Sequence, residues 1–344
     1  MAKPKYLSIA LLALLLCILP ACSAAEKASI ITISGQTMGT MYRIRLVSNK
    51  LRSRADLSHV SNSTLTLLED FNHQMNHYDP NSTLSKFNAL QNGSIQIKDE
   101  FRNCLLSAQQ IYQESHGAFD ITIAPLLKLW GYGPNSQELT SIPNQAALLA
   151  AKHNVGSTMA YELVGNQLTK LQASASIDLS AIAKGYAVDL VVQNLKKLGF
   201  DRFLVEIGGE IRASGTNIQN KPWSVAIIHP DSEINRYYAT VDLSDESMAT
   251  SGNYLTQTEI DGMTYSHTID PRSGYPIQNN IASVTVISED CVVADAMATA
   301  IGVLGVNAGL AWVESKSKIE AMILEREISG LLIEHHSSGF KRTS

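Results

Sequence analysis

The sequence has few cysteines and no basic stripe, and both absences exclude whole classes of protein. Only four of the 344 residues are cysteine, with no CxxC pair and no spacing typical of a zinc site. The formal net charge is −5 and no run of Lys and Arg is long, which argues against a nucleic-acid partner. Neither GxxxxGK[ST] nor GxGxxG occurs between a strand and a helix, so the two commonest nucleotide-binding motifs are absent.

One apolar run stands apart, and it lies at the N-terminus. Lysines near the start are followed by an apolar run over 7–19, which is too short to span a bilayer, and small residues come next. This order is typical of an export signal. The stretch "LPAC" resembles a bacterial lipobox, which implies that residues 1–21 are removed and that Cys22 is lipidated. A plain secretory signal is the alternative.

Two cysteines, Cys104 and Cys291, remain in the body of the chain. In an oxidising compartment two cysteines can pair, but a chain of this length does not need a disulfide to stabilise its core. Both residues lie in apolar, helix-like segments. We therefore interpret them as buried free thiols.

The composition is that of an ordinary globular protein, with 45% hydrophobic and 17% charged residues. It fits one large domain or two closely joined ones. No repeat of 20 to 50 residues and no low-complexity linker divides the chain. Strand-like and helix-like runs alternate without a regular βαβ rhythm, so the pattern favours the α+β class over doubly wound α/β.

Apolar periodicity predicts the main elements of this α+β chain. Two strands flank a Gly-Thr-rich break within 28–47, and helices are predicted over 57–76, 101–115, 144–155 and 291–305. Between residue 184 and the last of these helices the pattern is rich in strands, with a hairpin around Asp261 and Gly262. Two short strands are predicted near the C-terminus.

Lys184 raises the first question about chemistry. The stretch "IDLSAIAKGYAVDLV" indicates a strand end that runs into a helix beginning near Ser180. Lys184 then falls in the first helical turn, where the helix dipole disfavours a cation. A negative group should compensate it. That group is either a neighbouring carboxylate, Asp178 or Asp189, or a bound anion drawn to the free N–H groups of the helix start.

Asp295 and Thr299 form a second pattern, because residues four apart lie on one face of the predicted helix. Their oxygens suit a hard cation such as Mg²⁺, which leaves its other coordination positions to water or phosphate. Alternatively, the Asp only interacts with the helix dipole and the Thr hydroxyl bonds back to a carbonyl. On these two residues alone the second interpretation is favoured.

Further polar and aromatic residues lie in loops and in one apolar segment. In the loop "HTIDPRSGYP", His267 is either a general base or structural, and Arg272 either binds phosphate or ties the loop to Asp270. The loop "GGE" is either part of a site or an ordinary turn, because turns also require glycine and polar residues. The segment 117–134 and Tyr78 form either the wall of a pocket for a flat ring or ordinary core.

Taken in order, these pieces resemble one family. The eight stretches are "GQTMGTMYRI", "FNHQMNHYDPNSTLSKFN", "GAFDITIAPLLKLWGYGP", "IDLSAIAKGYAVD", "VEIGGEIRASG", "MATSGNY", "HTIDPRSGYP" and "SVTVISEDCVVADAMATA". They resemble the successive motifs of the ApbE family, the FAD:protein FMN transferases. The resemblance implies a single α+β unit over 29–344 with a T-fold-like core, preceded by a tether over 22–28. It also implies binding of FAD and Mg²⁺ and transfer of FMN to a Thr or Ser hydroxyl of an acceptor protein, with release of AMP.

The resemblance also implies roles for individual residues. Lys184 would face the FAD pyrophosphate, and His267 would be the base for the acceptor hydroxyl and would contact FAD. Mg²⁺ would be held by the side chains of Asp295 and Thr299 and by the backbone carbonyl of Ala181. The remaining residues that would line the FAD site are Met38, Tyr78, Ala118, Phe119, Asp120 and Asp178.

Two other functions stay open as alternatives. A Mg²⁺-dependent FAD pyrophosphatase would yield FMN and AMP, and a periplasmic FAD-binding lipoprotein would perform no reaction. An aromatic Tyr78 and the Asp295–Thr299 pair together favour the transferase. The resemblance implies acceptors among flavoprotein subunits of periplasm-facing electron-transfer or ion-pumping complexes. It implies a periplasmic protein anchored by lipid to the inner membrane, while Ser23 after the lipidated Cys leaves an outer-membrane address open.

Overall fold

A computed structural model describes most of the chain as one α+β unit. The described residues are 28–48, 54–134, 136, 139, 141–231, 236–252, 257–260 and 262–343. The predicted export signal, Cys22 and nearly all of the predicted tether lie outside these residues. Among the described residues, no helix has the length and apolarity that crossing a bilayer requires.

The centre of the fold is an eight-stranded sheet in which every neighbouring pair of strands is antiparallel. In spatial order its strands are β1 (Ser29–Thr37), β2 (Thr40–Ser48), β6 (Phe203–Ile207), β7 (Glu210–Ser214), β10 (Ser247–Gly252), β13 (Ile281–Ser288), β14 (Glu320–Arg326) and β15 (Leu332–His336). Every residue of β13 is buried, because both faces of the sheet are covered there.

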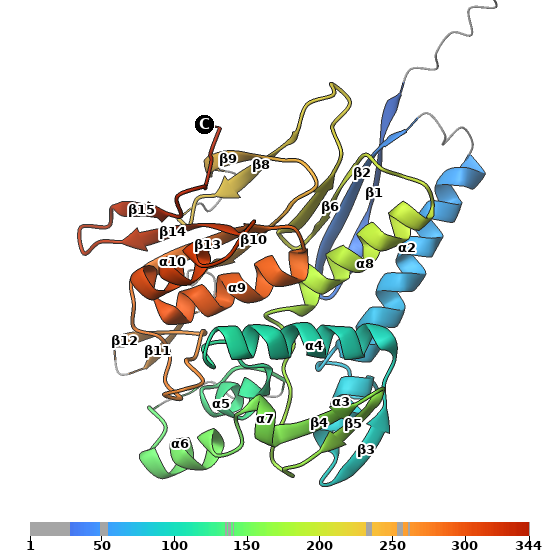
Figure 1. Ribbon diagram of the computed structural model, residues 1–344. Helices are drawn as coiled ribbons and strands as arrows, with labels where there is room; N and C mark the ends of the chain where they lie inside the picture. The colour runs from blue at the N-terminus through green and yellow to red at the C-terminus, as the bar shows by residue number, and fades with distance from the viewer. Residues whose placement is uncertain are drawn as a thin grey trace, which may run out of the picture.

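Helices cover one face of this sheet and a hairpin covers the other (Figure 1). The helical layer contains α2 (Arg54–Met75), α4 (Asp99–Glu114), α8 (Ala183–Lys197), α9 (Cys291–Leu304) and α10 (Val306–Glu314). The hairpin consists of β8 (Trp223–Ile228) and β9 (Tyr237–Leu243), whose apolar side chains form a separate core cluster with the second face of the sheet.

Smaller elements pack at one end of the sheet, beyond α4 (Figure 1). They are α3 (Thr83–Ala89), the 3-10 helix η2 (Ile121–Ile123), α5 (Ala124–Leu129), α6 (Gln145–Lys152), α7 (Ser157–Ala160), and the three-stranded sheet of β3 (Gly93–Gln96), β5 (Gln167–Lys170) and β4 (Tyr161–Val164). The predicted hairpin near Gly262 is present as β11 (Gln257–Ile260) and β12 (Met263–Ser266).

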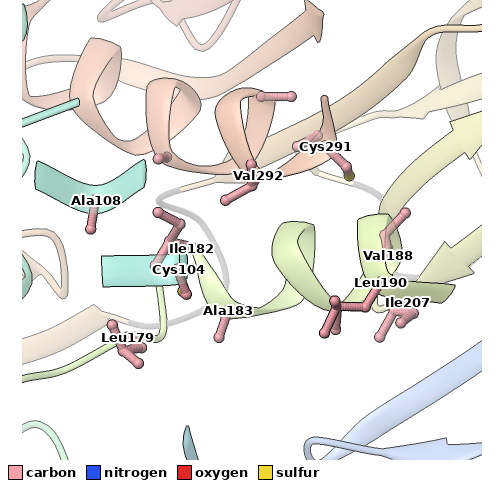
Figure 2. Packing of buried hydrophobic residues seen from close by; sticks show 14 of the residues in the cluster. Cys104, Ala108, Leu179, Ile182, Ala183, Val188, Leu190, Ile207, Cys291 and Val292 are labelled. Carbon is pink, nitrogen blue, oxygen red and sulfur yellow. The ribbon is translucent and has the colours of Figure 1, made fainter. Parts of the chain in front are cut away.

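The helices α8 and α9 pack closely against each other at the centre of the molecule. A Cβ atom at Gly185 would lie 2.4 Å from the carbonyl oxygen of Cys291 and 2.7 Å from the Cβ of Asp295, so only glycine allows the start of α8 to approach α9 this closely. Figure 2 shows apolar side chains of α4, α8 and α9, among them Cys104 and Val188, in the same buried cluster. Cys104 and Cys291 are buried and free, as predicted.

The predicted elements agree with the structure in type, and the α+β class is confirmed. Some boundaries differ by about three residues: α2 begins at Arg54 rather than 57, α6 ends at Lys152 rather than 155, and α8 begins at Ala183 rather than near Ser180. The carboxylate of Asp178 accepts a hydrogen bond from the Ser180 N–H at 2.7 Å, and the carbonyl of Leu179 accepts from the N–H of Ala183 at 2.8 Å. These bonds hold the chain in a turn before the helix starts.

Candidate functional site

Three adjoining cavities meet around the turn that precedes α8. The central cavity, of about 340 Å³, is lined by residues that include Asp120, Lys184, His267 and Asp295. The Tyr78 cavity, of about 400 Å³, shares Ser180 and Lys184 with it. A third, outer cavity of about 550 Å³ shares Asp178 and Leu127 with the central cavity and His77 with the Tyr78 cavity. The three cavities are therefore adjacent, which is the arrangement that a long, bent ligand requires.

Every predicted site residue described by the structure lines at least one of the central and Tyr78 cavities. The central cavity contains Ala118, Phe119, Asp120, Asp178, Ala181, Lys184, His267, Asp295 and Thr299. The Tyr78 cavity contains Met38, Tyr78 and again Lys184. Cys22, the predicted lipidation site, lies outside the described residues. Residues from distant parts of the sequence are thus brought together as the resemblance implies.

Lys184 is paired with a residue that the sequence analysis did not assign to the site. Its Nζ lies 3.2 Å from Oε1 of Glu210, the first residue of β7. The Glu210 side chain is 5% exposed and that of Lys184 is 28% exposed, so the pair sits at the inner end of the cavity. The charges of Asp295 and Glu210 raise the pKa of Lys184, although burial acts in the opposite direction. Lys184 is therefore a firmly protonated cation.

Of the two alternatives considered for Lys184, compensation by Asp178 or Asp189 is not what the structure shows. Asp178 accepts from Ser180 and lies 3.6 Å from Nε2 of His77, while Asp189 pairs with Arg212. Besides Glu210, the compensating charge comes from Asp295. Its Oδ2 accepts a hydrogen bond from the Gly185 N–H at 2.9 Å and so places a carboxylate at the positive end of α8.

Glu210 was missed because the signal for it is weak. It follows a turn in which Gly208 and Gly209 have φ angles of 61° and 103°, so the pattern "GGE" is fully explained by the turn between β6 and β7. Whether the carboxylate after such a turn faces a helix depends on the sheet's register. The only clue in the sequence is a carboxylate directly after two glycines, in the loop "GGE" that the pattern leaves ambiguous.

The cluster of Lys184, Glu210 and Asp295 contains two carboxylates and one ammonium. Oε2 of Glu210 is buried and has no hydrogen-bond partner among the described residues. Burial and the charge of Asp295 raise the pKa of Glu210, and Lys184 offsets this only in part. When both carboxylates are ionised, the cluster therefore carries more negative than positive charge, and a cation bound beside it would balance the excess.

Thr299 lies on the same face of α9 as Asp295 and lines the same cavity. Its hydroxyl is 3.2 Å from that of Ser251 in β10, so it reaches across to the sheet. Within the described ranges, no three His, Cys, Asp or Glu side chains are grouped so as to hold a metal ion. A metal site here would depend on one carboxylate together with hydroxyl and carbonyl oxygens, the ligand set that the resemblance implies.

Asp120 is the buried centre of the wall that Ala118 and Phe119 form. Its Oδ1 accepts hydrogen bonds from the Thr122 N–H at 2.8 Å, the Thr122 hydroxyl at 2.7 Å and the Ser157 hydroxyl at 2.7 Å. Burial raises the pKa of Asp120 in spite of these donors. The carboxylate therefore caps η2 and fixes this wall of the central cavity.

Tyr78 and Met38 form an open rim on the Tyr78 cavity. Tyr78 is 65% exposed, and its ring lies 4.3 Å from the His77 ring between centroids. Met38 lies in the turn between β1 and β2 and has a φ of 50°. This end of the hairpin lines the same cavity. An exposed tyrosine beside a thioether offers a surface on which a flat ring can stack.

His267 follows β12 and lines the central cavity. Its ring makes an edge contact with Tyr132 at 6.4 Å between centroids. The loop that follows is closed by Arg272, whose Nε and Nη2 donate to the two carboxylate oxygens of Asp270 at 2.9 and 2.8 Å. Of the two roles considered for Arg272, the structure shows the tie to Asp270.

Comparisons with known proteins identify close relatives. The model of the ApbE family matches residues 38–323. The chain is 35% identical over 330 residues to a FAD:protein FMN transferase of Haemophilus influenzae, which covers 94% of both chains. It is also 35% identical to one of Vibrio cholerae, over 92% of this chain and 93% of that one.

Comparison with solved structures gives the same family. The flavin transferase ApbE from Vibrio cholerae superposes with a TM-score of 0.81 at 34% identity, covering 91% of this chain and 98% of that one. The apo form of the flavinyl transferase ApbE from Pseudomonas stutzeri also gives a TM-score of 0.81 at 34% identity, with 91% and 96% covered.

Proposed function

The chain belongs to the ApbE family, and we propose on that basis that it transfers FMN from FAD to a Thr or Ser hydroxyl of an acceptor protein and releases AMP. One structural observation supports the roles that we propose for individual residues. The side chains with assigned roles in flavin binding, metal binding and proton transfer line two connected cavities that meet at Lys184. FAD is the substrate of this enzyme.

The reaction is a phosphoryl transfer, in which positioning and charge neutralisation dominate. The acceptor hydroxyl oxygen attacks the phosphorus of the FMN half of the pyrophosphate. A phosphoester bond to the acceptor forms, the bond from that phosphorus to the bridging oxygen breaks, and AMP leaves with that oxygen. His267 takes the proton of the hydroxyl.

Lys184 is the cation that this chain offers to the pyrophosphate. Glu210 orients its ammonium, and the residue lines both the central and the Tyr78 cavity. A fixed cation at the start of a helix attracts phosphate oxygens and offsets charge that develops on them. This is the anion that the sequence analysis considered for the start of α8.

Mg²⁺ fits the residues beside Lys184. The side chains of Asp295 and Thr299 and the carbonyl of Ala181 would hold it, and all three residues line the central cavity. The orphaned carboxylate oxygen of Glu210 supports a cation nearby, because the cluster has more negative than positive charge. When bound, Mg²⁺ supplies charge neutralisation at the pyrophosphate oxygens.

The protein acts in the periplasm, anchored to a membrane through lipid on Cys22. The charged start, the short apolar run and "LPAC" support this location. The inner membrane follows from family resemblance, and Ser23 is compatible with the outer membrane. Its acceptors are flavoprotein subunits of electron-transfer or ion-pumping complexes that face the periplasm.

Mass spectrometry of acceptor proteins tests the proposed function. Purified protein, FAD and Mg²⁺ are incubated with periplasm-facing flavoprotein subunits, and AMP is measured in parallel. We expect an FMN phosphoester on one Thr or Ser and one AMP per adduct. Rapid AMP release without acceptor, and no adduct on any subunit, would instead establish a FAD pyrophosphatase. Binding of FAD with neither product would establish a binding protein.

A further inference from the structure

The side chain of Asn88, in α3, clamps the backbone of Ile177. Its Nδ2 donates to the Ile177 carbonyl at 2.8 Å, and its Oδ1 accepts from the Ile177 N–H at 2.8 Å. One amide thus satisfies both backbone groups of a single residue, as a neighbouring strand would. Residues 175–179 belong to no helix or strand, so this clamp replaces the support that a sheet gives elsewhere.

Lys170, the last residue of β5, in turn holds Asn88. The residue is 4% exposed, and its Nζ donates to the Asn88 carbonyl at 2.7 Å and to the Phe87 carbonyl at 3.5 Å. The ammonium also lies 5.6 Å from the centroid of the Phe87 ring. Burial lowers the pKa of Lys170, but the carbonyls at the end of α3 and the aromatic ring favour its cation.

The clamped residue begins the segment on which the proposed site depends. Asp178 follows directly, and its N–H donates to the Ile121 carbonyl at 2.7 Å. Ala181, whose carbonyl is a proposed metal ligand, lies in the turn that Asp178 closes through Ser180. A shift of Ile177 would therefore move both the proposed FAD contact and the proposed metal contact.

We infer that Asn88, held in place by Lys170, is a positioning residue that sets the location of Asp178 and Ala181 for FAD and Mg²⁺. The inference rests on the proposed function and adds two residues to which that function assigns no ligand contact; Asn88 lines the outer cavity, and Lys170 lines none of the three. Groups that orient metal ligands typically change metal affinity or activity by roughly 10–100-fold when they are replaced. The effect should appear in binding constants while the protein stays folded.

The test compares Asn88→Ala, Lys170→Met and the double variant with the wild type. Lys170→Met keeps an unbranched side chain over Phe87 but removes the donor. Asn166→Ala is the matched control, because the Asn166 side chain donates to Asp99 and lines none of the three cavities. FAD dissociation constants come from flavin fluorescence in Mg²⁺ titrations, below the unfolding temperature of each variant.

For Asn88→Ala we expect the FAD dissociation constant and the Mg²⁺ concentration for half-maximal binding to rise about 10-fold. Lys170→Met should shift both values in the same direction by less. The double variant should match Asn88→Ala, because Lys170 acts through Asn88 and the effects are not additive. Asn166→Ala should bind like the wild type.

Wild-type constants in folded Asn88→Ala would overturn the inference, and so would additive effects in the double variant. If Asn88→Ala does not fold, Asn88→Asp replaces it, since that variant keeps the acceptor for the Ile177 N–H and sets a carboxylate oxygen against the Ile177 carbonyl in place of the donated bond. Failure of the wild type itself to bind FAD would instead contradict the proposed function.

Discussion

At the scale of single residues, Lys184 shows how a neighbouring contact changes an expectation drawn from local sequence. The helix dipole considered alone predicts that removing a cation from a helix start gains roughly 0.3–1 kcal/mol. The pair with Glu210 reverses this, because Lys184→Ala leaves a buried carboxylate beside Asp295 without its cation. We expect the free energy of unfolding to fall by on the order of 1–3 kcal/mol.

The pH dependence of this loss identifies its cause. The pKa of Glu210 is raised in the folded protein, so its protonated form contributes stability that is lost as pH rises through the folded pKa. Without Lys184 that pKa rises further, and the loss continues to higher pH. The deficit of Lys184→Ala in urea unfolding should thus be larger at about pH 9 than at about pH 6. It should shrink on a Glu210→Gln background, where only the charge of Asp295 remains to interact with Lys184; an unchanged deficit there would assign it to Asp295 or to another contact.

Asp295 has two separable roles, as a partner of the Gly185 N–H and as a proposed metal ligand. Asp295→Asn keeps an acceptor of the same size but removes the charge that a hard cation requires. We expect a folded variant that has lost most transfer activity. Mg²⁺ with FAD should raise the melting temperature of the wild type and leave that of the variant unchanged. Activity that survives both this substitution and EDTA would show that the metal site is misassigned.

Tyr78 is expected to decide between transfer and hydrolysis. Stacking of the flavin on its exposed ring would contribute about 0.5–1.5 kcal/mol beyond burial and hold FAD until an acceptor docks. Tyr78→Asn should therefore raise the share of AMP released without acceptor. Tyr237→Asn is the matched control, since Tyr237 is 62% exposed on β9 and lines none of the three cavities. An equal AMP share in all three proteins would remove Tyr78 from this role.

At the scale of elements, α9 is held at its start by a carboxylate from another helix. Asp189 of α8 accepts hydrogen bonds from the N–H groups of Cys291 at 3.1 Å and Val292 at 2.9 Å. Arg212 of β7 donates to the same carboxylate and to Asp290. Three elements are thereby joined at the helix that presents the proposed metal ligands.

Removing this carboxylate should destabilise the whole fold. Asp189→Ala leaves two N–H groups without an acceptor and leaves the buried Arg212 with only the exposed Asp290 as a partner, and the loss of one member of a buried pair costs on the order of 3–5 kcal/mol. Asp290→Ala, at a side chain that is 57% exposed, should cost less than about 1 kcal/mol. Urea unfolding of both variants measures the difference. Equal losses would mean that Asp189 contributes no more than a surface charge.

Most helices and strands could be predicted from the sequence, because the spacing of apolar residues indicates which face of each helix or strand is buried. The helix over 57–76, for example, is observed as Arg54–Met75. The start of α8 could not be predicted in this way. The turn before it depends on a hydrogen bond from the Ser180 N–H to the side chain of Asp178. Such a bond produces no periodic pattern of apolar residues in the sequence.

At the scale of the whole molecule, the proposed site depends on contacts between residues far apart in sequence. Periodicity cannot show that Lys184, Glu210 and Asp295 meet, because that requires the sheet order and the crossing of α8 and α9. The ordered motifs supplied that information for the residues that match the family pattern. Two of these motifs contain Glu210 and Asn88, but the resemblance implied no role for either residue.

The final prediction concerns how the molecule is held at a membrane. Cys22 precedes β1 by few residues, and six residues of fully extended chain span only roughly 20 Å. A lipid on Cys22 would therefore keep the body of the protein at the membrane and raise its effective concentration toward membrane-bound acceptors. Cys22→Ser should appear in the soluble periplasmic fraction. It should flavinylate a soluble acceptor fragment at the wild-type rate and the membrane-embedded acceptor more slowly. Unchanged membrane association of this variant would contradict lipidation of Cys22.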